Sequence, residues 1–229
     1  MKKIILVLLI IVFYHVSVAQ HVEIGITTGY STFAMSDLKT DLENAAPSAP
    51  FDAVLTNNFP GYLSFGGFMV EHFGFYGIGI TYQYNSTGAR VTSSDYSGRY
   101  NFDESLRCNS IGLRNNFLLD KFGNCGIGAT LDAGVNFTKM KIEETLVLNN
   151  STVHDQTMNL ESTSFFLHPG LFADYLIFPF LKAGINAGYQ IDFKGMLKIE
   201  ELESGLKSDW SGFRLQVSLS FVPAGLIKE

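Results

Sequence analysis

The segment "LKAGINAGYQIDF", residues 181–193, alternates between apolar and polar or glycine positions over its whole length. Successive side chains of an extended strand point to opposite faces. One face therefore carries Leu181, Ala183, Ile185, Ala187, Tyr189, Ile191 and Phe193. The other carries Lys182, Gly184, Asn186, Gly188, Gln190 and Asp192. The pattern predicts a strand with one apolar and one polar face, and the fold depends on which face meets water.

The same alternation predicts seven further strands, separated by two kinds of connection. We expect these strands at about 22–33, 59–72, 76–86, 106–119, 126–139, 161–177 and 213–221. Long connections are predicted at 34–58, 87–105, 146–160 and 195–210, and they alternate with tight turns. This layout is typical of bacterial outer-membrane barrels. It predicts an all-β fold, an eight-stranded antiparallel up-and-down transmembrane β-barrel with long extracellular loops and short periplasmic turns. The stretch 35–45 is expected to form a short helix.

The N-terminus has the three parts of a secretory signal. Lys2 and Lys3 precede an apolar run at 4–13, and Ser17-Val18-Ala19 provides small residues for cleavage. The run is shorter than the roughly 20 residues that a membrane-spanning helix needs. We therefore predict a signal peptide at 1–19 and a barrel domain at 20–229. Because no other apolar stretch approaches that length, an embedded form has to be a barrel.

Charge and cysteine content exclude several classes of partner. Loss of Lys2 and Lys3 would change the formal charge from −6 to −8, and an acidic chain is a poor ligand for nucleic acid. Cys108 and Cys125 are placed on consecutive strands at different distances from the intervening turn, so we predict two free thiols. Cys and His are too few for a recognisable zinc site. No cofactor and no metal are predicted.

The residues of the polar faces indicate that those faces lie inside the barrel. A soluble barrel carrying an apolar ligand, the alternative, would turn Lys and Glu to bulk water. The predicted polar faces instead carry mostly Gly, Thr, Ser, Asn and Gln. Small neutral groups of this kind suit an eight-stranded barrel, whose interior side chains nearly fill. The apolar faces are therefore expected to meet lipid.

The few charges on the polar faces are balanced in sign. We predict a lumen polar network of Glu23, Arg114, Asp132, Lys182, Asp192 and Arg214. Charges that are buried in a lumen require compensation, so balance is expected. Arg114 and Asp132 fall within diagonal reach on neighbouring strands. The remaining four are predicted to gather at the two ends, Asp192 with Arg214 and Glu23 with Lys182.

Two predicted strands fit the alternation less well. Pro169 falls inside the strand at 161–177, where it cannot donate a ladder hydrogen bond, and we expect a bulge at 168–170. The strand at 59–72 has apolar residues on both faces and ends with adjacent Glu71 and His72. A second bulge is expected there.

The most suggestive surface feature is the segment 93–104. Its candidate contact residues are Tyr96, Arg99, Tyr100 and Phe102, which offer the aromatic and guanidinium groups favoured at binding surfaces. The competing interpretation is a packed hairpin with no partner.

The chain resembles a known family in three places. These are the signal ending "VAQ", the opening "GITTGYSTFAMSDLK" (25–39) and the segment "DYSGRYNFD" (95–103). It is similar to the small eight-stranded outer-membrane β-barrel proteins of Bacteroidota, the PorT-like members among them. The resemblance implies a barrel in the cell outer membrane and transfers no catalytic residue. The end of the chain departs from the usual terminal aromatic, because Phe221 is followed by "VPAGLIKE".

The expected function is that of a non-enzymatic outer-membrane protein. No catalytic residues are predicted, and the mature histidines have no spacing that places a Ser and a His on one strand face near the rim. The expected partners are outer-membrane lipid and an envelope protein docked on the loops, as in a structural or secretion-machinery accessory. The alternatives are a narrow small-solute channel, a lipid-modifying enzyme and a soluble ligand carrier.

Overall fold

The computed structural model describes residues 22–49, 53–149, 151–199 and 202–222. The predicted signal peptide at 1–19 and the final residues 223–229 lie outside the described residues. Among the described residues, no helix is long and apolar enough to cross a membrane.

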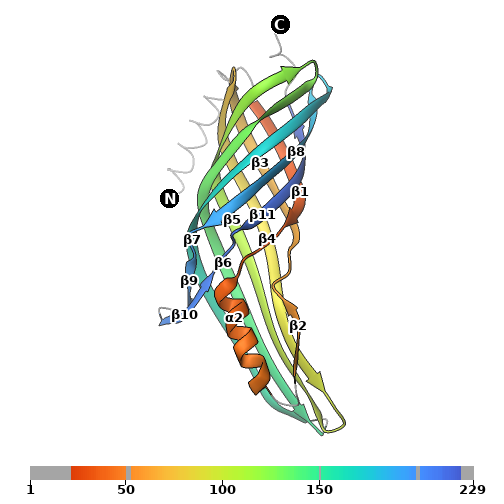
Figure 1. The fold of residues 1–229 in the computed structure, drawn as a ribbon, viewed down its shortest axis with the longest axis vertical. Helices are drawn as coiled ribbons and strands as arrows, with labels where there is room; N and C mark the ends of the chain where they lie inside the picture. Colours follow the sequence, from red (N-terminus) through yellow and green to blue (C-terminus); the bar gives the residue numbers. More distant parts are fainter. Residues whose placement is uncertain (1–21, 50–52, 150, 200–201, 223–229) are drawn as a thin grey trace, which may run out of the picture.

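Eight antiparallel strands close into a ring (Figure 1). Around the ring they are β1 (Val22–Ser31), β3 (Tyr62–Phe73), β4 (Tyr76–Ser94), β5 (Gly98–Phe122), β6 (Cys125–Leu148), β7 (Ser151–Phe178), β8 (Leu181–Asp192) and β11 (Gly212–Phe221). The last strand pairs with the first, from Ile24 opposite Phe221 to Ser31 opposite Arg214. The predicted all-β antiparallel fold and the eight strands of the ring are confirmed; β2, β9 and β10 are additional short strands outside the ring.

Which face lies outside is clear from exposure. Leu131, Ile185 and Val217 are 39%, 47% and 53% exposed, whereas Asp132 is 3% exposed. Asn186 and Ser218 line a cavity in the interior. The prediction that the apolar faces point outward is therefore confirmed.

One end of the ring has the three tight turns that the sequence predicts. β3 joins β4 through Gly74 and β5 joins β6 through Gly123, both with left-handed φ values of 63° and 59° that favour glycine. β7 joins β8 through Pro179 and Phe180. Both thiols are free, Cys108 buried and Cys125 exposed beside its turn, as predicted.

At the other end the long-loop prediction is wrong for two of the four connections. β4, β5, β6 and β7 are 19, 25, 24 and 28 residues long and continue past the ring as paired strands. The pairing of β5 with β6 runs from Gly98 opposite Leu148 down to the opposite turn. The segments 87–105 and 146–160 are therefore mostly strand.

The physical reason is a reversal of polarity along each strand. Within the ring, Ser110 of β5 faces inward and Ile111 outward, so the polar side is inside. Further along the same strand, Leu106 is buried inside and Arg107 is exposed outside. Alternate residues keep pointing to the same side of the sheet, but the residues on the inner side change from polar to apolar. In the sequence the apolar positions of the alternation therefore shift by one residue, and such a shift looks like the end of a strand.

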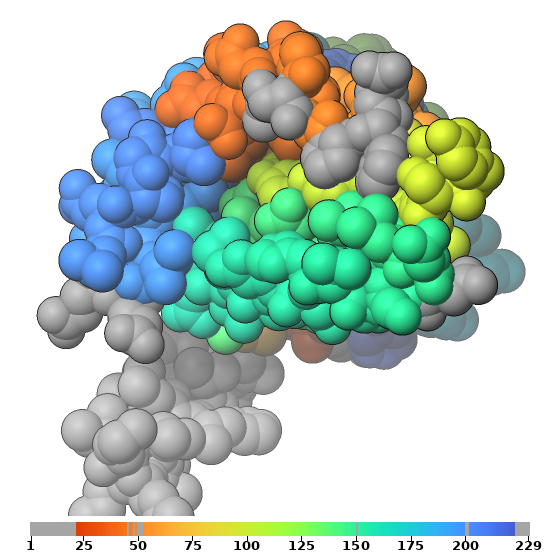
Figure 2. Space-filling view, turned by 90° about the horizontal axis from the view of Figure 1, so that it is seen from below, coloured from red at the N-terminus to blue at the C-terminus, as the bar shows by residue number. Residues whose placement is uncertain are grey.

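The extended strands and several short elements form a second compact part, which we call the lobe. The short elements are α2 (Ser36–Ala45), η1 (Ala46–Ser48), β2 (Val54–Asn58), β9 (Gly195–Ile199) and β10 (Leu202–Ser208). The helix predicted at 35–45 is confirmed as α2. It contacts β10 on one side and β2 on the other, and so closes the open side of the lobe sheet. Figure 2 shows this end: α2 (orange) faces the β6–β7 hairpin (green), with β9 and β10 (blue) beside them.

The lobe has an apolar core, in contrast to the ring. Its buried members are Phe33, Met35, Leu38, Leu42, Phe59, Ala89, Val91, Tyr100, Leu106, Cys108, Met140, Ile142, Leu160, Leu197 and Trp210. Leu38 and Leu42 are one helical turn apart and turn the same face of α2 inward. Trp210 lies at the junction with the ring: its ring meets Phe33 edge-on at 5.0 Å, and its Nε1 donates to Thr138 at 2.8 Å.

The two predicted bulges are both absent from the described pairings. β3 keeps one register with β1 and with β4 throughout, which places Val70 and His72 inside and Glu71 outside. At Pro169 the register of β7 with β6 is unbroken. Pairing of β7 with β8 lapses at His168 and Pro169 and resumes at Gly170 in the same register. The missing proline N–H is therefore accommodated by a gap in the ladder.

Glu104 is an exception within the lobe core. Its side chain projects from β5 among apolar neighbours, is 4% exposed, and its Oε2 has no hydrogen-bond partner among the described residues. Burial, assisted by the negative charge of Asp41 on α2, raises the pKa of Glu104 from 4.5 to about 8. The carboxyl is therefore held protonated at neutral pH.

We expect Glu104 to make the lobe less stable as pH rises. An unfolded glutamate releases its proton near pH 4.5, whereas the folded one keeps it to about 8, so stability falls through this window. Glu104→Gln should remove most of the dependence of lobe stability on pH. At pH 8 it should raise the free energy of opening of the lobe by an amount on the order of a few kcal/mol, which is measured as slower amide hydrogen exchange in α2. Asp155→Asn, on the exposed side of β7, is the control. Equal pH slopes for wild type and Glu104→Gln would contradict this assignment.

Candidate functional site in the interior of the ring

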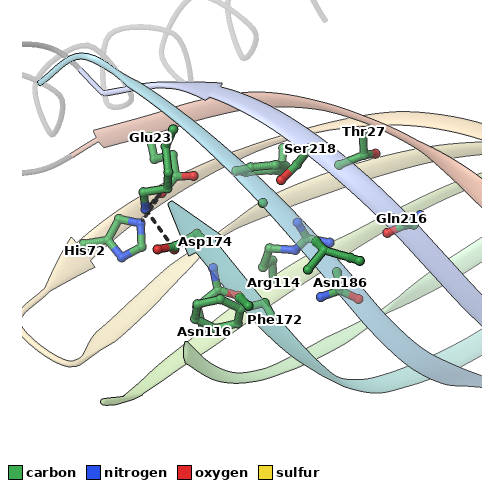
Figure 3. A pocket seen from close by; sticks show the side chains of 15 residues that line it. Glu23, Thr27, His72, Arg114, Asn116, Phe172, Asp174, Asn186, Gln216 and Ser218 are labelled. Carbon is green, nitrogen blue, oxygen red and sulfur yellow. Dashed lines mark hydrogen bonds and ion pairs between the residues drawn. The ribbon is translucent and has the colours of Figure 1, made fainter. Parts of the chain in front are cut away.

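The predicted charges occupy three levels of the interior, beginning at the short-turn end. There, Glu23 of β1 accepts a hydrogen bond from Lys182 of β8 at 2.7 Å and lies 3.0 Å from His72 Nε2 of β3. Ser220 of β11 donates to the other carboxylate oxygen at 2.6 Å, and Lys182 also lies 3.3 Å from Asp174 of β7. Five strands are thus joined through one carboxylate and one ammonium group (Figure 3).

A bidentate ion pair lies at the middle level. Arg114 and Asp132 are directly opposite each other on β5 and β6, and not diagonal as the sequence suggested. Arg114 Nε and Nη2 donate to the two carboxylate oxygens at 3.0 and 2.8 Å, and both side chains are buried. His168 Nδ1 lies 3.6 Å from Asp132, and the guanidinium stacks 4.9 Å from the ring of Phe68. This geometry satisfies two charges that would be costly if left alone.

A cavity of about 50 Å³ separates these two levels. Its lining includes His72 and Lys182 on the short-turn side. Arg114, Phe172 and Asn186 line the other side, to the right of His72 in Figure 3. A cavity of this size suits one or two water molecules. It is far smaller than the several hundred Å³ of an ordinary ligand pocket.

The third level lies next to the lobe and contains Asp192 and Arg214, which bond to different partners. Asp192 accepts hydrogen bonds from Ser164, from Asn136 at 3.0 Å and from the Trp210 backbone N–H at 2.9 Å. Arg214 donates to Asn85 at 2.9 Å and to Ser31 at 3.3 Å. Asp192 and Arg214 form no ion pair with each other in the described structure. The Trp210 backbone bonds to both, its N–H donating to Asp192 and its carbonyl oxygen accepting from Arg214.

Sequence reasoning missed the neutral partners at this level. The sequence pattern does not single out Asn85, Asn136, Ser164 and Trp210, although they hydrogen-bond to Asp192 or Arg214. Trp210 is the single tryptophan of the chain and immediately precedes the last strand. A lone tryptophan just before a predicted strand is the sequence signal that could have indicated a buried contact at this point.

The contacts run across the interior as well as around it. β6 reaches β8 through Asn136 and Asp192, and β4 reaches β11 through Asn85 and Arg214. The first contact passes over one intervening strand, β7, and the second over two, β3 and β1, so these side chains fill the interior and join strands that are not paired with each other. The described histidines His72, His154 and His168 each lie beside a carboxylate. The chemistry that this arrangement supports is charge compensation.

The four candidate contact residues of 93–104 do not form one surface. Tyr96 is at the tip of the β4–β5 hairpin and Arg99 is exposed beside it. Tyr100 points into the lobe and donates from its hydroxyl to Glu144 at 3.1 Å, and Phe102 packs against the lobe core. Burial, together with that carboxylate, raises the pKa of Tyr100 to about 12.

Comparison with known proteins defines the class of fold. No protein-family model matches this chain. No curated protein matches it either. A major outer membrane protein of Thermus thermophilus superimposes with a TM-score of 0.50 and 10% identity, over 88% of this chain and 99% of its own. At that identity the likeness shows the fold alone, that of an outer-membrane β-barrel protein.

Two further solved structures are more distant in geometry and add nothing to that conclusion. OprG of Pseudomonas aeruginosa aligns with a TM-score of 0.44 and 12% identity, over 90% of this chain and 95% of its own. Ail, the attachment invasion locus protein of Yersinia pestis, aligns with a TM-score of 0.38 and 12% identity, over 88% and 98%.

We expect the middle ion pair to be needed for a stable ring. Arg114→Met leaves Asp132 buried without its cation and should cost about 3–5 kcal/mol of unfolding free energy. Replacing both, with Asp132→Leu added, should recover much of that loss. Lys198→Met breaks an exposed pair with Glu203 and should cost at most about 1 kcal/mol. Urea midpoints of the detergent-folded protein measure all three, and a double variant as unstable as Arg114→Met would refute compensation as the role of the pair.

Proposed function

We propose that this chain is an integral outer-membrane β-barrel protein, exported by its signal peptide at 1–19 and anchored by the eight-stranded ring. The observation that carries the proposal is the polarity of the ring, with large apolar side chains exposed outside and hydrogen-bonded polar groups buried inside. A closed ring leaves no strand edge unpaired, as a lipid environment requires. The reverse polarity would be expected of a soluble barrel.

The height of the apolar surface supports the same proposal. On β6 the outward apolar residues run from Ile127 to Phe137. At about 3.3 Å per residue and a tilt of roughly 40°, this stretch rises about 25 Å, the height of the apolar band in outer-membrane barrels. Exposed aromatic residues gather towards both borders: Tyr30, Tyr82, Phe137, Phe165, Phe193 and Phe213 on the lobe side, and Phe75, Phe122, Tyr175, Phe178, Phe180 and Phe221 on the short-turn side.

In this proposal the short turns face the periplasm and the lobe stands on the cell surface. The lobe takes the place of the long extracellular loops expected from the sequence, and it is the part that would dock with an envelope partner. Tyr96 and Arg99, exposed at its tip, are the two candidate contacts that remain available. The resemblance of the sequence to the PorT-like proteins of Bacteroidota favours an accessory role in the envelope.

The proposed role is non-enzymatic. The hydrogen-bonded side chains that fill the interior between non-adjacent strands, together with the small volume of the cavity, argue against a solute channel. His72, His154 and His168 each contact a carboxylate, and among the described residues no hydroxyl or thiol nucleophile is hydrogen-bonded to any of the three rings. Planar-bilayer conductance of the purified protein tests the channel alternative, and steady conductance steps would favour it over docking.

The membrane assignment predicts a depth-dependent cost for charge on the outside. Leu131→Arg lies on the outward apolar surface near the middle of the band and should destabilise the protein in lipid vesicles by about 2–4 kcal/mol. Thr157→Arg, which points outward from the lobe part of β7, should have almost no effect. The measurement is the urea dependence of folding in vesicles. A mature chain that stays monomeric in buffer without detergent, with Leu131→Arg no less stable than Thr157→Arg, would overturn the assignment.

The docking role predicts that the lobe tip touches another envelope component. A photo-crosslinker placed at Tyr96 should give a specific adduct in native membranes, whereas one at Thr28, on the outside of the ring, should give none of that mass. Adducts of identical mass from both positions, or adducts with the protein itself alone, would count against docking.

A further inference from the structure

The outer surface changes from apolar to charged along one row of neighbouring residues. Arg107 of β5 lies opposite Lys139 of β6, Lys139 lies opposite Glu161 of β7, and Glu161 lies opposite Lys198 of β9. One step nearer the ring on the outward face of β6 is Phe137, which is exposed and apolar. The charged row therefore begins at the border of the apolar band.

Three cations of this border lie close together. Arg107 and Lys139 are direct cross-strand neighbours, and Lys141 is the next outward residue of β6. Like charges placed opposite each other on a sheet are destabilising. Lys139 lies 2.9 Å from Glu161 and Lys141 lies 2.6 Å from Glu143, but both pairs are widely exposed and offset little of that cost.

Arg107 lacks a counter-ion. It is exposed, and among the described residues it has neither an ion pair nor a side-chain hydrogen bond. Its guanidinium is free to bind an anion in bidentate geometry. The formal charge of the mature chain is −8, from −6 for the whole chain less Lys2 and Lys3, so a local excess of cations here is not a general property of the surface.

A groove of about 580 Å³ opens beside Arg107 on the same outer wall. Tyr62 and Tyr84 lie on its ring side, and Arg90, paired with Asp103, lies further into the lobe. Two other carboxyl groups line the groove, Glu143, which is paired with Lys141, and the buried Glu104. Arg107 is therefore the cation of the lining that has no ion pair among the described residues. The connection between β2 and β3 forms one wall. It is fixed to β4 by hydrogen bonds from Phe59 N–H to the Gly88 carbonyl at 3.0 Å and from the Thr87 hydroxyl to the Pro60 carbonyl at 2.8 Å.

We propose that the Arg107 end of this groove binds the phosphate headgroup of an anionic outer-leaflet lipid, with Arg107 on the phosphate and Lys139 and Lys141 beside the groove. The inference rests on the proposed membrane orientation. Headgroups lie just beyond the hydrocarbon, where the charged row begins, and aromatic side chains at that depth suit the lipid's polar–apolar border. The bound phosphate relieves the repulsion between Arg107 and Lys139 that the empty surface retains.

The test is retention of lipid by the folded protein in native mass spectrometry. Detergent-folded protein is titrated with short-chain phosphatidic acid, whose phosphate is anionic, or with phosphatidylcholine of equal chain length, whose phosphate is neutralised by choline. We expect wild type to favour phosphatidic acid, and Arg107→Gln with Lys139→Gln to reduce its retention roughly tenfold. Arg99→Gln, an exposed arginine at the lobe tip, is the matched control and should retain lipid like wild type. Circular dichroism verifies that each variant is folded.

The outcomes separate this inference from the proposed function. Equal retention of the two lipids by wild type, or unchanged retention by the double variant, overturns the headgroup site. Competition by inorganic phosphate at equal concentration would assign the groove to free phosphate instead and would also overturn it. Flotation with neutral phosphatidylcholine vesicles tests insertion separately. A chain that floats without preferring phosphatidic acid refutes the lipid site alone, and a chain that does not float refutes the membrane role.

Discussion

The pairing of β1 with β11 is the interaction on which the rest of the structure depends. It runs from Ile24 opposite Phe221 to Ser31 opposite Arg214 and converts an open meander into a closed ring. Closure gives every ring strand two neighbours and removes the edges that would otherwise expose unpaired backbone groups. It also creates an interior too narrow for more than one layer of side chains from each wall. Once the ring is closed, both the outside and the inside are constrained.

The interior meets that constraint by giving its charges hydrogen-bonding partners. The exterior carries mainly large apolar side chains, with Glu71 of β3 as a charged exception close to the short-turn end. Arg114 with Asp132 and Lys182 with Glu23 are direct pairs. Arg214 and Asp192 instead bond to neutral groups and share the Trp210 backbone, although Arg214 Nε has no partner among the described residues. A buried charge needs hydrogen-bonding partners. In this interior the partner is an opposite charge in two cases and a set of neutral groups in the others.

One chain contains two cores of opposite polarity, joined by continuous strands. In the ring the interior is polar, and in the lobe it is apolar around Leu106, Met140 and Trp210. The strands β4 to β7 pass from one to the other without changing the direction in which alternate residues point. The border of the two cores inside coincides with the charged row outside, at Arg107 and Lys139. A single level of the molecule therefore separates a lipid-facing surface from a water-facing one on the proposed orientation.

The sequence by itself determined the strand count, the tight turns, the outward apolar faces and the free thiols, because each depends on local alternation and turn residues. It also placed the charges inside, since a buried charge requires a partner whichever strand supplies it. The register of the contacts was decided only by the tertiary structure, which bonds the Trp210 backbone to both Asp192 and Arg214. The lobe was decided there too: whether a charged alternating segment such as 98–105 is loop or strand depends on neighbours distant in sequence. Pairing partners and the reversal of inside polarity are properties of the assembled sheet, and no local pattern encodes them.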